Sequence, residues 1–73
     1  MSNGLYSKEH KIIVEKLIKA RHDAGVDQIE VAKKLGKSQS YLSKIESGQR
    51  KIDVVQLKKF AEIYKKDINF FLK

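Results

Sequence analysis

A chain of 73 residues is long enough for one domain with a modest hydrophobic core. Its residues are 41% hydrophobic and 34% charged, and the lack of cysteine excludes disulfides, thiolate zinc sites and a cysteine nucleophile. The net charge of +7 favours an anionic partner, either nucleic acid or a membrane surface. The N-terminus has no apolar signal core and no segment reads as a membrane span, so we expect a cytoplasmic protein.

The first expected helix starts after Ser7, a good N-cap, and ends at Gly25, because glycine adopts a left-handed backbone at little cost. Apolar residues recur between them with helical period, which predicts a buried stripe formed by Ile13, Leu17, Ala20 and Ala24. His10 and His22 lie about three turns apart on this helix. We therefore interpret them as surface residues that cannot share a metal ion.

Two short helices follow, separated by a very short turn. Asp27 and Glu30 have the capping-box pattern at the start of the second helix, which ends at Gly36. The residues that this helix is expected to bury are Val31, Ala32 and Leu35. Only Lys37 and Ser38 precede the third helix, and Ser38 is itself a good N-cap. Two helices joined by so short a turn must cross steeply.

The third helix is expected to run from about Gln39 to Ser47, with Gly48 after it. At about 100° per residue, one of its faces is apolar and consists of Tyr41, Leu42 and Ile45. The opposite face has amide and hydroxyl groups, one cation and no carboxylate, on Gln39, Ser40, Ser43 and Lys44. Such side chains can reach base edges in the DNA major groove, whereas carboxylates would repel the phosphates. An ordinary solvated helix that happens to be rich in serine is the alternative.

A basic loop over residues 49–52 leads to a second capping-box pattern at Asp53 and Gln56. The fourth helix is expected to bury Val54, Leu57, Phe60, Ala61 and Tyr64. Asp67 would cap a last short helix, and the residues expected to close the core there are Ile68, Phe71 and Leu72. The chain shows no strand alternation of useful length, so the pattern predicts a compact all-α domain of five helices.

The run DQIEVAKKLGKSQSYLSKIESGQRKID resembles the helix-turn-helix of the phage Cro/repressor family, also called the xenobiotic-response-element type of bacterial regulators. The matching positions are Gln28, Ala32, Gly36, Leu42, Ile45, Glu46 and Gly48. Arg21 and the tail LKKFAEIYKKDINFFL extend the resemblance over almost the whole chain. The resemblance implies a lambda-repressor-like fold with the helix-turn-helix at helices 2 and 3. Residues 1–6 would be an N-terminal tail and residues 7–73 the DNA-binding domain.

The resemblance also implies roles for single residues. Gln28 would bond a phosphate and brace Gln39, and Glu46 would pair with Arg21 in a structural ion pair. The residues expected to face the bases are Gln39, Ser40, Ser43 and Lys44. Those expected nearer the phosphate backbone are Ser38, Tyr41, Arg50 and Lys51, and Lys37 is also expected to contact DNA.

Val55, Ile63 and Phe70 fall off the core stripes, and the resemblance implies dimerisation at this end of the chain. We therefore expect a homodimer on a roughly palindromic double-stranded operator. It would regulate transcription by occupancy, more often as a repressor than as an activator. RNA polymerase and a toxin protein are further partners to consider, and no cofactor, metal or membrane is expected.

Other classes of function fit the sequence less well. The lysines are spread over all helices and mixed with Glu9, Glu15 and Asp23, which disfavours a membrane-surface helix. Scattered acids and the absence of a serine–histidine arrangement argue against an enzyme. An antitoxin-like or other protein-interaction module stays open, as does a controller of restriction-modification genes, because the fold alone does not separate them. The acid-free face of the third helix favours DNA.

Overall fold

The computed structural model describes residues 7–72, so the expected tail over residues 1–6 and the terminal Lys73 lie outside the described residues. This part of the chain is all-helical, which confirms the predicted fold class. The helices are α1 (Lys8–Ala24), α2 (Gln28–Leu35), α3 (Gln39–Glu46), α4 (Val54–Tyr64) and α5 (Asn69–Leu72).

Four helices start at the capping residues that the sequence predicts. The side-chain oxygens of these residues accept a backbone N–H three residues later, and the caps are Ser7, Asp27, Ser38 and Asp53. The capping box is complete at α4, where the Gln56 side chain also accepts from the backbone of Asp53. Gly36 ends α2 with φ of 71°, a left-handed conformation that glycine adopts without a Cβ penalty. This turn allows α3 to begin only three residues later.

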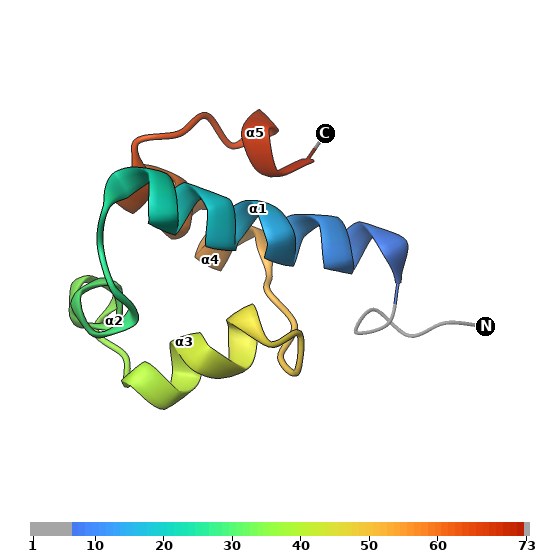
Figure 1. The fold of residues 1–73 in the computed structure, drawn as a ribbon. Helices are drawn as coiled ribbons and strands as arrows, with labels where there is room; N and C mark the ends of the chain where they lie inside the picture. Colours follow the sequence, from blue (N-terminus) through green and yellow to red (C-terminus); the bar gives the residue numbers. More distant parts are fainter. Residues whose placement is uncertain (1–6, 73) are drawn as a thin grey trace.

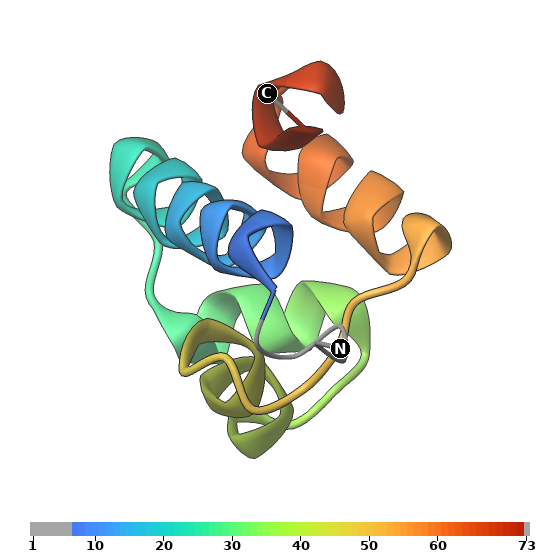
Figure 2. The same ribbon diagram turned by 90° about the vertical axis from the view of Figure 1, so that its right-hand side faces the viewer.

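The helices pack around one core, and α1 contacts three of the others. Figure 1 shows α1 across the middle of the molecule, with α3 on one side of it and α5 on the other. In the turned view of Figure 2, α4 lies beside α1 and α3 remains at the end opposite α5. α2 packs mainly on α3, while α1 packs on α3, α4 and α5. The arrangement leaves the outer side of α3 uncovered by the other helices.

The core joins all five helices. Its most buried large side chains are Leu17, Val31, Leu42, Ile45, Phe60 and Phe71. Three residues expected in the core are instead exposed, and the prediction is wrong for Ala24, Val54 and Leu72. All three stand at helix ends, where the helical period continues but no neighbouring helix covers the side chain. Val54 is 64% exposed and Leu72 is 56% exposed.

Two further predictions about burial fail. His10, expected at the surface, is only 8% exposed, because it lies four residues before Val14 and seven before Leu17 on the buried face of α1. Ile63 and Phe70, expected to lie clear of the core stripes, are partly buried and pack against the core cluster. The apolar pattern therefore predicts the buried face of each helix but not which residues at its borders are covered.

Candidate nucleic-acid interface

The outer face of α3 is exposed and carries no carboxylate. Its four side chains are all exposed, while Leu42 and Ile45 on the inner face are 1% and 0% exposed. These outer residues are Gln39, Ser40, Ser43 and Lys44. Glu46, which ends the helix, turns inward, and its side chain is only 7% exposed. The face therefore presents short hydrogen-bonding groups and one cation to the surroundings.

The structure brings Arg21 and Glu46 together in a two-pronged ion pair between α1 and α3. Arg21 Nε donates to Glu46 Oε2 at 2.7 Å, and Arg21 Nη2 donates to Oε1 at 3.0 Å. Arg21 Nη1 also donates to the carbonyl oxygen of Val26 at 3.1 Å. The Arg21 side chain is 13% exposed. Its hydrogen bond to Glu46 raises the pKa of the guanidinium, against the lowering effect of burial. This contact fixes the C-terminal end of α3 on α1.

Two glutamines continue this network toward the surface. Gln28 Nε2 donates to Glu46 Oε1 at 3.0 Å, and Gln39 Nε2 donates to Gln28 Oε1 at 3.4 Å. A carboxylate can only accept, so Gln28 must turn its amide nitrogen to Glu46 and its oxygen to Gln39. Gln39 must then offer its nitrogen to Gln28, which leaves its own carbonyl oxygen free to face outward. The network thus sets which hydrogen-bonding group Gln39 presents at the surface.

Two cationic side chains lie close to the ring of Tyr41 on α3. The Nζ atom of Lys37 lies 5.3 Å from the centroid of the Tyr41 ring, and the guanidinium carbon of Arg50 lies 4.9 Å from it. The Tyr41 hydroxyl accepts a hydrogen bond from the side-chain amide of Gln56. The sequence identified Gln56 only as part of the α4 cap. Its second contact joins residues fifteen apart, and the local pattern has no signal for it.

The remaining predicted DNA contacts are exposed cations and a helix cap. Ser38 accepts from the backbone of Tyr41 at 3.1 Å while staying exposed. Lys44, Arg50 and Lys51 are exposed, and none of them forms an ion pair with a residue in the 7–72 range. Their charges are therefore available to an anionic partner on the side of the molecule that carries α3.

These features accompany a match to a known family. A family model described as helix-turn-helix matches residues 17–71, which is most of the chain. The chain belongs to the XRE-type helix-turn-helix family. The protein is therefore a DNA-binding helix-turn-helix regulator, and double-stranded DNA is its partner. Comparison with curated proteins finds no match.

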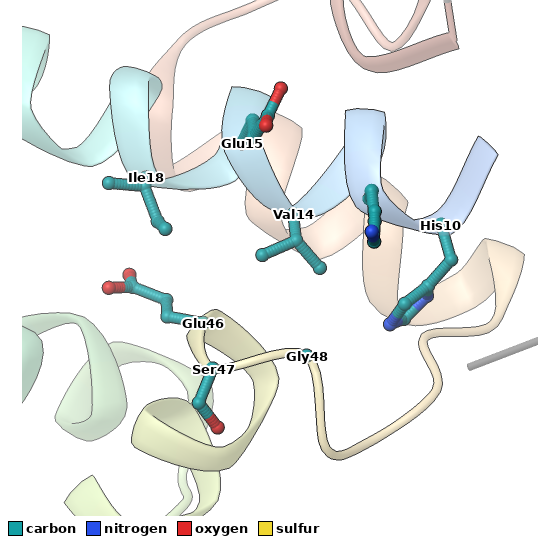
Figure 3. A pocket seen from close by; sticks show the side chains of 8 residues that line it. His10, Val14, Glu15, Ile18, Glu46, Ser47 and Gly48 are labelled. Atoms are coloured by element: carbon teal, nitrogen blue, oxygen red, sulfur yellow. The ribbon is translucent and has the colours of Figure 1, made fainter. Parts of the chain in front are cut away.

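A cavity in the described part of the regulator lies away from the outer face of α3. It has a volume of about 430 Å³ and lies between α1 and the end of α3 (Figure 3). Val14 and Ile18 point into it from α1, whereas Glu15 points away. His10 also lines it, and the Nε2 atom of His10 has no hydrogen-bond partner in the described part of the chain. The floor is largely apolar, and no group of three metal-ligating side chains occurs within residues 7–72.

The residues predicted for dimerisation do not form one exposed patch. Val55 is 64% exposed, whereas Ile63 and Phe70 are partly buried against the core. The Phe70 ring lies near two cations, with Lys16 Nζ at 5.3 Å and Lys66 Nζ at 4.7 Å from its centroid. None of the helices over residues 7–72 has the length and apolar character that crossing a membrane requires.

Proposed function

We propose that the regulator is a repressor that inserts α3 into the major groove of a palindromic operator and acts as a homodimer. The observation that carries this proposal is the acid-free outer face of α3, anchored through Gln28 and Glu46 to Arg21. Gln39, Ser40, Ser43 and Lys44 would contact base edges. Ser38, Lys37, Arg50 and Lys51 would contact phosphates and set the register on the duplex. Occupancy of the operator would then block transcription.

A dimer is part of the proposal because one helix covers too few base pairs for selectivity in a genome. A twofold axis would place the two α3 helices about 34 Å apart, one DNA turn, in successive major grooves. An interface at the end that carries Phe70 and α5 would leave α3 uncovered, since the two helices lie at opposite ends of the molecule. Val55 supplies the exposed apolar contact on α4.

Binding to random duplex DNA as a function of salt tests the nucleic-acid part of the proposal. We expect log K to fall linearly with log salt concentration, since several Lys and Arg side chains would displace counterions. Selection of bound sites from random duplexes should then yield a sequence with twofold symmetry. A protein that shows no affinity for any duplex at low salt would contradict the proposal and favour a protein-interaction module.

The dimer is tested with a matched pair of substitutions on α4. Val54 and Val55 are both 64% exposed, but only Val55 points directly away from the core side of the helix. Val55→Ser should weaken binding to the full palindrome about fivefold and leave a single half-site unaffected, because it loses one apolar contact across the axis. Val54→Ser serves as the control. Equal affinities of both variants for the palindrome would rule out an interface at Val55.

A further inference from the structure

A second, smaller pocket lies beside Tyr41, on the side of α3 that holds the cations. It has a volume of about 200 Å³, and we name it the Tyr41 pocket after its lining of Leu35, Lys37, Tyr41, Gln56, Lys59 and Phe60. The pocket joins the turn between α2 and α3 to the first half of α4. Two of its six lining residues are lysines and none is acidic. Its chemistry is therefore that of an anion site.

The charges of the two lysines are not neutralised within the described chain. Neither Lys37 nor Lys59 forms an ion pair with a carboxylate of residues 7–72. The guanidinium of Arg50, which stacks on the Tyr41 ring, adds a third positive charge beside the pocket. The carboxylate of Asp53 is occupied by the backbone N–H of Gln56 and does not line the pocket. The local field therefore favours an anion.

The hydrogen-bond network also leaves a donor available. Gln56 Oε1 accepts from the backbone N–H of Asp53 at 3.2 Å, so the side-chain nitrogen of Gln56 must face Tyr41. The Tyr41 oxygen is consequently the acceptor in that bond, and its own proton is free for another partner. No residue in the 7–72 range accepts this proton in a hydrogen bond. An oxyanion in the pocket could accept a hydrogen bond from this hydroxyl.

We propose that the Tyr41 pocket binds a phosphate group of the DNA backbone, held by the Lys37 and Lys59 ammonium groups and by the Tyr41 hydroxyl. The inference rests on the proposed function and adds Lys59 to the DNA-binding surface, with Gln56 as the residue that positions the Tyr41 hydroxyl. The pocket adjoins the N-terminal end of α3, so a phosphate bound there would fix how that end enters the groove.

The test compares Lys59→Gln with Lys58→Gln in duplex binding by fluorescence anisotropy over a range of salt concentrations. Both lysines are exposed on α4, but only Lys59 lines the pocket. Lys59→Gln should weaken binding about fivefold and lower the slope of log K against log salt by about 0.9, the value for one lost phosphate contact. Lys58→Gln should change affinity less than about twofold. Equal effects of the two variants would overturn the proposal.

Tyr41→Phe keeps the stacked ring and removes the hydroxyl. It should weaken binding to every duplex about threefold without changing the salt slope, because no charge is lost. Unchanged affinity for DNA would show that the Tyr41 hydroxyl does not contact the bound phosphate.

A titration of the free protein with inorganic phosphate, followed by the backbone amide NMR signals, reports on the pocket separately from DNA binding. Shifts of the amide signals of Lys37, Tyr41 and Gln56 that disappear in Lys59→Gln would support the anion site. If the wild type showed these shifts but bound no duplex, the proposed function would fail, and the ligand of the pocket would be free phosphate. The absence of shifts at these residues would also overturn the inference, and the proposed function would stand if the wild type still bound a selected duplex.

Discussion

The end of the molecule that carries α3 and the end that carries α5 are held by different kinds of contact. At the α3 end, Arg21, Glu46, Gln28 and Gln39 form a chain of side-chain hydrogen bonds from 2.7 to 3.4 Å long. At the α5 end, Phe71 is fully buried and meets Phe70 edge-on at a centroid distance of 5.1 Å. Two lysines lie near the Phe70 ring.

The contacts at the α3 end orient polar side chains, whereas those at the α5 end hold helices together. Hydrogen bonds are directional, so the network at the α3 end determines which atom each glutamine turns outward. Apolar burial is roughly proportional to area and does not depend on direction, so the α5 end can hold the helices together without fixing any polar group. A surface that reads bases requires the first kind of support.

The largest expected loss of stability follows from removing the ion pair at the α3 end. Glu46→Ala would leave the Arg21 charge largely buried without its partner, and we expect the free energy of unfolding to fall by about 3–5 kcal/mol. Urea unfolding measures the loss. Glu30→Ala is the control, because Glu30 and Lys34 form an exposed pair at 3.9 Å and its removal should cost less than about 0.5 kcal/mol. Similar losses for the two variants would show that the Arg21–Glu46 pair does not stabilise the fold.

Two neighbouring residues of α5 differ sharply in burial. Phe71 is 0% exposed and Leu72 is 56% exposed. Phe71→Ala should cost about 3 kcal/mol, at the low end for a buried phenylalanine because a terminal four-residue helix can close part of the cavity. Leu72→Ala should cost less than about 1 kcal/mol. Thermal unfolding of both variants checks the order, and a larger loss for Leu72→Ala would place the wrong side of α5 in the core.

A smaller effect separates affinity from base reading. Lys51→Ala should weaken binding to specific and random duplexes alike and lower the salt slope by about 0.9, since Lys51 is proposed to contact a phosphate. Titrations at several salt concentrations measure both quantities. A loss confined to the selected site would mean that Lys51 contacts a base instead.

The smallest expected effect concerns Tyr64, which is 4% exposed and whose hydroxyl has no hydrogen-bond partner within residues 7–72. Burial, with a contribution from Glu46, raises the pKa of this hydroxyl above its ordinary value of 10.0. The unfolded chain therefore ionises first, and stability is retained below about pH 10 and falls as the pH rises further. Tyr64→Phe should be stable to within about 1 kcal/mol of the parent and lose less stability above pH 10. A steeper loss in the variant would contradict this assignment.

Local chemistry explains why so much of the α3 end could be predicted from the sequence. Asp27, Gly36 and Ser38 act within a few residues of themselves, so capping rules locate α2, the turn and α3. The outward placement of Ser40 and Lys44 follows from the helical period once the buried Leu42 is recognised.

Contacts between distant residues account for what the sequence did not predict. The helical period places His10 on the inner face of α1, but the loop that contains Gly48, with which His10 lines one cavity, is brought there only by the fold. The bond between Tyr41 and Gln56 depends on how α4 folds back toward α3. The exposure of Leu72 depends on where α5 ends relative to its neighbours, which helical periodicity does not specify.

We propose that α3 reads bases through side chains that the hydrogen-bond network orients, and the substitution Gln39→Ala removes the outermost of them. The variant is compared with the parent on a duplex selected from random sequences and on an unselected duplex, with the exposed loop residue Gln49 changed to alanine as the control. We expect Gln39→Ala to lose about 1–3 kcal/mol of binding free energy on the selected site and to change little on the unselected one. Equal losses on the two duplexes would contradict it.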